Sequence, residues 1–334
     1  MIKKLIRGIT VAASVTVAAT GVQAEEMDTL NFGIISTESS QNLRTIWEPF
    51  LADMSEQLDM EVKAFFAPDY AGIIQGMRFD KVDVAWYGNK SAMEAVDRAG
   101  GEIFAQTVDV SGNPGYWSLL IAHREDERLN SVDDILSNAS ELTFGNGDPN
   151  STSGFLVPGY YVFAMNGVDA KSAFKRTLNS SHETNALAVA NKQVDVATFN
   201  TESFGRLKET QPEKAEQLKV IWKSPLIPSD PLVWRKNLPE QSKQKIRNFI
   251  FTYGTDDARE KAVLADLQWA PFKESSNDQL IPIRQLALFK EKAALENAES
   301  LSSSDKARLS SIKKELQELD RRAALIEKQQ AAAE

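Results

Sequence analysis

The chain has 334 residues, no cysteine, two histidines and a formal charge of −9 at pH 7. The lack of cysteine excludes disulfide bonds, thiolate metal sites and cysteine nucleophiles, and two histidines alone argue against a transition-metal site. The acidic balance argues against nucleic-acid binding, and it means that an anionic ligand would have to be attracted by a local feature rather than by overall charge.

Residues 1–24 have the features of a secretory signal peptide. Lys3, Lys4 and Arg7 form a basic start, residues 9–21 are apolar or small, and residues 22–24 have the small-x-small form of a cleavage site. The apolar stretch is too short for a stable membrane anchor, and no cysteine follows it that could carry a lipid. We therefore expect a soluble, exported protein without a membrane span.

Short apolar runs alternate with helical patterns through most of the chain. Residues 30–36 and 62–66 indicate strands, and apolar residues recur at helical spacing within 43–58 and 73–77. This order of strands and helices predicts an α/β fold with a mostly parallel sheet that is covered by helices on both faces.

Two similar segments indicate two lobes that are built alike. Residues 81–89 read Lys-Val-Asp-Val-Ala-Trp-Tyr-Gly-Asn, and residues 193–200 read Gln-Val-Asp-Val-Ala-Thr-Phe-Asn. Ligands of open parallel sheets bind beyond the carboxyl ends of the strands, so we expect the two loops on opposite sides of a cleft. The long apolar segments 116–122 and 220–234 are the expected crossings between the lobes and the hinges for their closure.

The run Ser151-Thr152-Ser153 lies between a predicted strand and an apolar helical stretch at 155–164. The free N–H groups and the positive dipole end of a helix start bind anions, and hydroxyl groups add donors without adding charge. The alternative is a plain N-cap in a flexible loop, which needs only one such residue. Pro158 lies a few residues into this helix, so we expect a kink or a short first turn there.

His182 follows Ser181 at another expected helix start, where it could donate to an anion or serve as a surface or capping residue. His123 lies in a charged stretch and is expected to be a surface or capping residue without a role in function. A serine hydrolase built from Ser151, His182 and Asp230 is a rival from another class, although the segment lacks the glycine that a nucleophile elbow requires.

The pattern changes from about Glu274, where the sheet signals stop. After the run 302–304, apolar residues alternate at spacings of three and four, as in a coiled-coil seam. A lone helix of this kind is marginal in water, so we expect it to pair with a second copy of the chain; packing along the protein's own body is the alternative. The seam comprises Leu309, Ile312, Leu316, Leu319, Ala323 and Ile326.

Five runs of the sequence closely resemble the phosphonate-binding proteins of bacterial phosphonate ABC importers. The resemblance extends from about Leu30 to Leu288 and is weakest in the C-terminal helix. The matching runs are 32–39, 65–77, 86–89, 147–160 (with Gly-Asp-Pro-Asn-Ser-Thr-Ser-Gly-Phe-Leu at its start) and 182–187 (His-Glu-Thr-Asn-Ala-Leu).

The resemblance implies a two-lobed, class II periplasmic-binding-protein fold. The residue patterns described above add two crossover hinge strands and a C-terminal helical extension. It also implies that the protein works in the periplasm, carries out no catalysis, needs no cofactor or metal, and passes a ligand such as 2-aminoethylphosphonate to a membrane permease. The expected domains are a first lobe of residues 25–118 and 232–290, a second lobe of residues 119–231, and a helical extension of residues 291–334.

The resemblance also assigns roles to residues of the expected cleft. Carboxylates hold the ligand amine in such proteins, and the matching positions are Glu202, after the second similar loop, and Asp230, in the second crossing. Without the resemblance each would more often be a solvated surface acid. The main rival is the same fold binding phosphite, phosphate or a sulfonate, which need carry no amine. The positions implied for the phosphonate are Tyr70, Tyr116, Ser151, Thr152, Ser153 and His182, with Tyr87 as a less certain neighbour.

Overall fold

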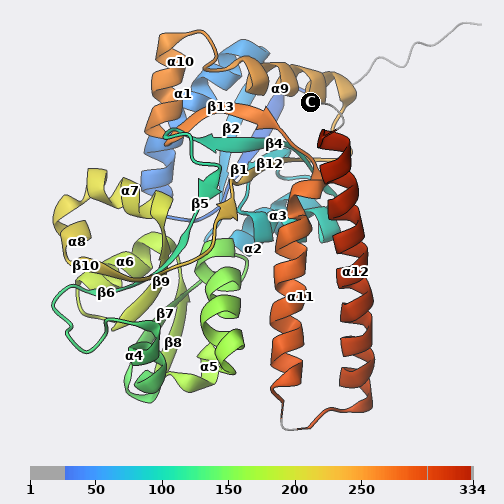
Figure 1. Cartoon of the computed structure of the whole chain (residues 1–334). Coiled ribbons are helices and arrows are strands. Elements are labelled where there is room, and N and C mark those ends of the chain that lie inside the picture. Colours follow the sequence, from blue (N-terminus) through green and yellow to red (C-terminus); the bar gives the residue numbers. More distant parts are fainter. Residues whose placement is uncertain (1–26, 299, 332–334) are drawn as a thin grey trace, which may run out of the picture.

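The computed structural model describes residues 27–298 and 300–331 and consists of two α/β lobes and a long helical hairpin (Figure 1). The two-lobed α/β architecture that the sequence predicts is confirmed. The signal peptide expected at residues 1–24 lies outside the described residues. Within the described part of the chain, every helix is too short or too polar to cross a membrane.

The first lobe contains a six-stranded sheet. β1 pairs in parallel with β2 and β3, whereas β12, which returns from the second lobe, runs antiparallel between β3 and β4. The sheet is therefore mixed rather than mostly parallel, because the returning strand enters it from the opposite end. Its order is β13 (Trp269–Glu274), β4 (Gly101–Asp109), β12 (Pro231–Arg235), β3 (Val84–Trp86), β1 (Thr29–Ile34) and β2 (Glu61–Phe66). Its helices are α1 (Ser40–Leu58), α2 (Tyr70–Arg78), α3 (Asn89–Arg98), α9 (Glu240–Thr252) and α10 (Ala258–Asp266).

The second lobe contains a five-stranded sheet that is also mixed. β7 pairs in parallel with β8 and β9, whereas β6 runs antiparallel between β9 and β10. The strand order is β10 (Leu218–Lys223), β6 (Ser118–His123), β9 (Val196–Asn200), β7 (Thr143–Gly147) and β8 (Arg176–Ser180). The helices are α4 (Val132–Ser137), α5 (Ala170–Ala173), α6 (His182–Ala190), α7 (Thr201–Thr210) and α8 (Pro212–Glu216), with 3₁₀ turns η1 (Ala139–Glu141) and η4 (Ala164–Asn166) and π-helical turns η2 (Thr152–Leu156) and η3 (Gly159–Phe163).

The link between the lobes is a two-stranded ribbon of β5 (Gly115–Tyr116) and β11 (Ile227–Pro228). The predicted crossings 116–122 and 220–234 are longer than this ribbon, because most of their apolar residues belong to the sheets through β6, β10 and β12. At Gly115 an added Cβ would lie 2.0 Å from the carbonyl oxygen of Ile227, so only glycine allows the two hinge strands to pair this closely.

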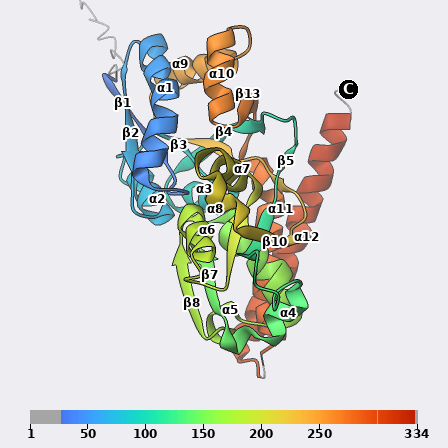
Figure 2. The same cartoon turned by 90° about the vertical axis from the view of Figure 1, so that its left-hand side faces the viewer.

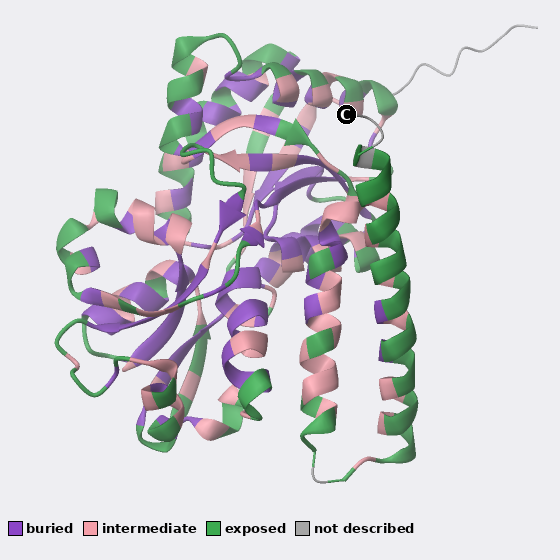
Figure 3. Cartoon of the chain, viewed as in Figure 1, coloured by how far each residue is buried: buried purple, intermediate pink, exposed green. Residues whose placement is uncertain are grey.

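Each lobe has its own apolar core, as two independently packed sheets require. The first-lobe core centres on Trp47, whose ring lies 5.3 Å from both Phe32 and Trp269. The second-lobe sheet is covered on both faces, with Phe199 in one cluster and Phe144 in the other. Figure 3 shows the buried strands of both lobes and, in contrast, the largely exposed outer faces of the C-terminal hairpin.

The hairpin consists of α11 (Ile281–Glu296), which follows the 3₁₀ turn η5 (Asn277–Leu280), and α12 (Ser303–Ala331). Two residues of the predicted seam, Ile312 and Leu316, are buried, and Arg308 of α12 forms two hydrogen bonds with Glu291 of α11. Pairing of the seam with a second copy is therefore not supported. The seam packs inside the same chain because α11 provides an antiparallel partner that the sequence pattern of α12 alone did not reveal.

Candidate functional site

The structure brings all eight residues assigned by the resemblance to the walls of one small cavity between the lobes. The free space that remains between these side chains is about 10 Å³, so a ligand can enter only when the lobes separate. The walls are Ile35, Thr37, Tyr70, Trp86, Gly88, Tyr116, Ser151, Thr152, Ser153, His182, Asn200, Glu202, Ser203, Arg206 and Asp230.

Five helices begin at this cavity, and Figure 2 shows the first lobe, with α2 and α3, above the second lobe, with α6. A helix start carries unpaired N–H groups and a positive dipole end, although capping side chains at α2, η2, α6 and α7 already accept from one N–H each. Such starts would favour an anion between the lobes, which is the local feature that the composition requires of an anion-binding protein. The residues at these starts are Tyr70 of α2, Gly88 before α3, Ser151 before η2, His182 of α6 and Asn200 before α7.

Of the two roles considered for the run Ser151-Thr152-Ser153, the structure shows the N-cap directly, together with hydrogen bonds to other parts of the chain. Ser151 is the N-cap of η2, since its Oγ accepts from the Gly154 N–H at 2.9 Å. Thr152 is not a cap; its Oγ1 accepts from the Lys90 N–H of the first lobe at 2.9 Å. The irregularity expected at Pro158 takes the form of π-helical turns on both sides of the proline. Two of the three hydroxyl groups therefore do more than cap a helix, because Ser153 Oγ also accepts from Asn200 Nδ2 at 3.1 Å.

His182 is buried, and its Nε2 lies 3.4 Å from the hydroxyl oxygens of both Ser151 and Ser153. Burial, together with the nearby Arg206 guanidinium, lowers the pKa of His182 to about 4. The imidazole is therefore neutral near pH 7 and supplies a hydrogen bond rather than a charge. Its Nδ1 has no hydrogen-bond partner in the described residues, so no carboxylate orients it as in a hydrolytic triad.

Asp230 does not have the role that a triad would give it, because it makes no hydrogen bond with His182 within the described residues. Its Oδ1 accepts from Tyr116 Oη at 2.9 Å and from Asn89 Nδ2 at 3.2 Å. Burial and the nearby Glu202 raise the pKa of Asp230 well above its usual range, and burial raises that of Glu202 to about 7. Two enclosed acids that both resist ionisation are a favourable environment for a ligand ammonium, which would stabilise their charged forms.

Sequence reasoning missed Arg206, which lies one turn after Glu202 on α7 and lines the cavity. Its guanidinium forms an ion pair with Glu38 of the first lobe, and the two side chains are only 11% and 9% exposed. The four-residue spacing from Glu202 on a predicted helix placed both side chains on one face and could have identified Arg206. No sequence signal identified Glu38, because the pair forms only where the lobes meet.

The sequence reasoning also did not identify two more hydrogen-bond donors, the side chains of Thr37 and Trp86. Thr37 Oγ1 and Trp86 Nε1 line the cavity and are buried without a hydrogen-bond partner in the described part of the chain, so both are available to a ligand oxygen. Tyr87 does not reach the cavity, because alternation along β3 turns it into the first lobe, where its Oη donates to the carbonyl oxygen of Ile73 at 3.0 Å.

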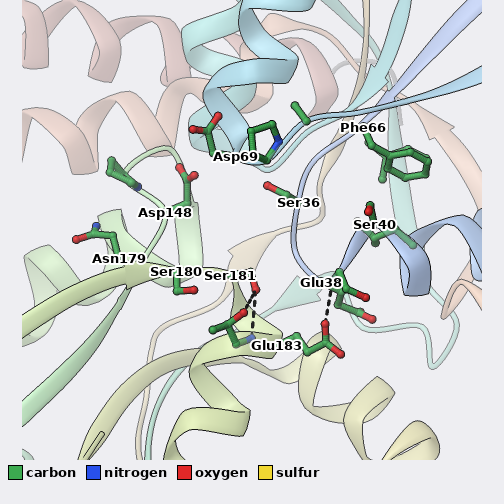
Figure 4. A pocket seen from close by; sticks show the side chains of 17 residues that line it. Ser36, Glu38, Ser40, Phe66, Asp69, Asp148, Asn179, Ser180, Ser181 and Glu183 are labelled. Atoms are coloured by element: carbon green, nitrogen blue, oxygen red, sulfur yellow. Dashed lines mark hydrogen bonds between the residues drawn. The ribbon is translucent and has the colours of Figure 1, made fainter. Parts of the chain in front are cut away.

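A wider pocket at the mouth of the cleft is shown in Figure 4, with residues of both lobes around it. Glu183, the neighbour of His182, crosses this boundary: its carboxylate accepts from Ser39 N at 2.8 Å and from Asn42 Nδ2 at 2.6 Å. Tyr70 N donates to Asp148 Oδ2 at 3.2 Å in the same region. These contacts join the lobes directly, so the structure represents the closed arrangement.

Comparison with known proteins identifies the group to which this geometry corresponds. Residues 32–280 match a family model described as "ABC transporter, phosphonate, periplasmic substrate-binding protein". The phosphonates-binding periplasmic protein of Escherichia coli K12 is 63% identical over 300 residues, which cover 89% of this chain and 88% of that protein. The proteins of this group are substrate-binding components rather than enzymes.

A solved structure at high sequence identity and a relative at lower identity extend the comparison. A binding-protein component of an ABC phosphonate transporter from Pseudomonas aeruginosa is 67% identical, with a TM-score of 0.88 over 90% of this chain and all of that one. A phosphate-import protein of Mycolicibacterium smegmatis is 29% identical over 209 residues, covering 60% of this chain and 64% of that protein. Relatives at lower identity therefore carry names that refer to other phosphorus oxyanions.

Proposed function

The chain belongs to the family of periplasmic substrate-binding proteins of phosphonate ABC transporters, and we propose that its ligand is an aminoalkylphosphonate such as 2-aminoethylphosphonate. The observation that carries the proposal is the pairing of two opposite environments in one cavity. Helix starts and hydroxyl groups supply hydrogen-bond donors, and two enclosed acids, Glu202 and Asp230, supply acceptors. A short zwitterion complements both.

In the proposed complex the phosphonate oxygens accept from the hydroxyl groups of Ser151, Thr152 and Ser153, from Tyr70 and from neutral His182. The ammonium donates to Glu202 and Asp230, and Tyr116 already donates to Asp230. Each hydrogen bond to a charged group contributes roughly 1.5–3 kcal/mol net. Several of them, less the free energy cost of closure, are sufficient for about −8 kcal/mol, which corresponds to a Kd of about 1 μM.

Closure about the β5–β11 ribbon would enclose the ligand, and opening would release it to the permease. No covalent step is involved, so affinity depends on the contacts made in the closed arrangement. A cleaved signal peptide at residues 1–24 would place the soluble protein in the periplasm, where such a permease collects its ligand.

A calorimetric ligand series tests the proposal. We expect 2-aminoethylphosphonate to bind at least tenfold more tightly than ethylphosphonate, because only the former offers an ammonium to Glu202 and Asp230, and a tenfold difference corresponds to about 1.4 kcal/mol. Phosphate should bind more weakly than either alkylphosphonate. Equal affinity for the aminoethyl and ethyl compounds, or a preference for phosphate or phosphite, would reject the assignment of the amine side.

The hydroxyl run gives a second prediction. Thr152→Ala or Ser153→Ala should weaken every phosphonate alike, by about 1–3 kcal/mol, because a buried phosphonate oxygen loses a donor. The thermal stability of the unliganded protein should change little for these two variants, whereas Ser151→Ala should also lower it, since Ser151 caps η2. Calorimetry and thermal melts measure the two effects separately. Lower stability with unchanged affinity in all three variants would make the run purely structural.

The pH dependence of binding gives a third prediction. In the closed arrangement the Glu202 pKa is about 7, so this carboxyl is largely protonated below pH 7 without ligand, and ammonium binding favours its ionised form. Binding of 2-aminoethylphosphonate should therefore release a proton, and affinity should fall as the pH decreases from 8 to 6. Titrations in two buffers of different ionisation enthalpy measure that proton. The Glu202→Gln variant, with the same ligand, should release fewer protons; identical proton release would assign the proton elsewhere.

A further inference from the structure

A second cavity lies on the far side of η2 from the phosphonate site, between α11 and the second lobe. Its volume is about 670 Å³, within the usual range of small-molecule sites. α11 provides Lys290 and Ala294, and the second lobe provides Phe155, Gly159, Phe163 and Val168 among others. The cavity is therefore bounded by the C-terminal hairpin on one side and by the anion-binding segment of the second lobe on the other.

Lys290 is the distinctive residue of this cavity. Its ammonium lies 4.2 Å from the centre of the Phe155 ring, and it forms no hydrogen bond or ion pair with another described residue. Burial, with a smaller effect of Lys90, lowers the pKa of Lys290 to about 8, so the side chain is still charged near pH 7. A half-buried ammonium without an acceptor favours an anion beside it.

The rest of the lining determines the kind of anion. Phe155, Phe163 and Val168 give the cavity an apolar wall, while the Nδ2 of Asn146 makes no hydrogen bond within the described residues and adds a neutral donor. Asp169 is also in the lining, but both of its carboxylate oxygens accept hydrogen bonds from its own helix start. The lining therefore suits one anionic group attached to an apolar body.

Helix α11 connects this cavity to the movement of the lobes. Ile283 and Leu286 near its start pack in one apolar cluster with Leu156 and Val157 of the second lobe and with Tyr116 of the hinge. The helix follows η5 and contacts α3 of the first lobe as well as η3 and η4 of the second, so it bridges the two lobes (Figure 1). A ligand that contacts both α11 and the second lobe would stabilise the arrangement in which the two are close together.

We propose that this cavity binds a small molecule with one anionic group on an apolar body, and that its occupancy favours the closed arrangement of the lobes. This site differs from the phosphonate site, because it takes a different ligand and acts on the first site through η2 and α11. Because binding free energies are reciprocal, each ligand should increase the affinity of the other by the same factor.

The site itself is tested with 8-anilinonaphthalene-1-sulfonate, followed by fluorescence in the absence of phosphonate, so that the result is independent of the proposed function. Lys290→Gln should weaken saturable binding of the probe at least tenfold. Lys292→Gln is the matched control, because it removes the same charge from the same helix, where Lys292 pairs with Glu296 at 3.2 Å, and it should have no effect. Gly159→Ala should also weaken binding, because its Cβ would lie 2.5 Å from Lys290 Nζ. Equal probe affinity in the wild type, Lys290→Gln and Gly159→Ala would overturn the site.

The coupling is tested by titrating 2-aminoethylphosphonate with and without a saturating concentration of the probe. We expect the phosphonate Kd to decrease at least threefold with the probe in the wild-type protein and to be unchanged by the probe in Lys290→Gln. Lys290-dependent probe binding that leaves the phosphonate Kd unchanged would overturn the coupling to closure. A failure of phosphonate binding in every sample would instead reject the proposed function and leave the probe result intact.

Discussion

Asp230→Asn should weaken 2-aminoethylphosphonate by about 2–4 kcal/mol, because a ligand ammonium enclosed beside it would lose a charged partner. The amide preserves the shape of the side chain and can still accept from Tyr116 Oη. Ethylphosphonate should bind equally well or more tightly, since removal of a negative charge relieves repulsion of the phosphonate dianion. Calorimetric titration of both ligands measures the difference in free energy.

Asp230 lies between the hinge strand β11 and the returning strand β12, so a general disturbance of the hinge must be distinguished from loss of the amine contact. Glu202→Gln serves this purpose, because Glu202 lies on α7, away from the ribbon, and should show the same selective loss. Glu216→Gln, an exposed position on α8, controls for the change in net charge. A loss of equal size for both ligands in Asp230→Asn, without a selective loss in Glu202→Gln, would contradict the amine assignment.

Arg206→Gln should weaken every phosphonate by about 3–5 kcal/mol, because closure would then bury Glu38 without its partner. The pair joins opposite lobes and both side chains are nearly enclosed, so its loss acts on the closed arrangement rather than on either lobe alone. Burial, together with the nearby Glu183, raises the pKa of Glu38, opposed by Arg206. The variant should therefore recover affinity as the pH is lowered and Glu38 becomes protonated, when measured with ethylphosphonate, which has no amine that depends on ionised Glu202.

A double-mutant cycle separates this pair from the direct contacts of Arg206 with the cavity. Glu38→Gln combined with Arg206→Gln should restore part of the affinity that the single Arg206 variant loses, because no uncompensated charge remains. Calorimetry on the four proteins provides the coupling free energy. Affinity in Arg206→Gln within twofold of the wild type would show that the ion pair does not contribute to closure.

The local structure of the site could be predicted from the sequence, but its assembly could not. Ser151 and His182 were placed at helix starts because capping residues and apolar periodicity are local signals. The convergence of five helix starts on one cavity depends on how strands are ordered in two sheets, which no local pattern encodes. The roles of Glu202 and Asp230 required the family resemblance, since an isolated acid is more often a surface residue.

The predictions of mostly parallel sheets and of a seam that pairs with a second copy were wrong, and the Arg206–Glu38 pair was missed, because all three features depend on contacts between distant segments. The sheets are mixed because strands β6 and β12, next to the two crossings between the lobes, run antiparallel to their neighbours. Their direction follows from how the two lobes are connected, and no single segment of the sequence encodes it. The apolar periodicity of α12 is compatible with packing against another chain or against α11. The turn of the hairpin brings α11 alongside α12 and so favours packing within the same chain. Arg206 and Glu38 are 168 positions apart and meet only on closure.

The most direct test of the central claim is a crystal structure of the protein with 2-aminoethylphosphonate. We expect a closed protein in which the phosphonate oxygens lie within hydrogen-bond distance, about 2.7–3.1 Å, of the Ser151 and Thr152 side chains, with the ligand nitrogen equally close to Glu202 or Asp230. A ligand nitrogen exposed to solvent, or a phosphonate bound at the acids instead of the helix starts, would contradict it.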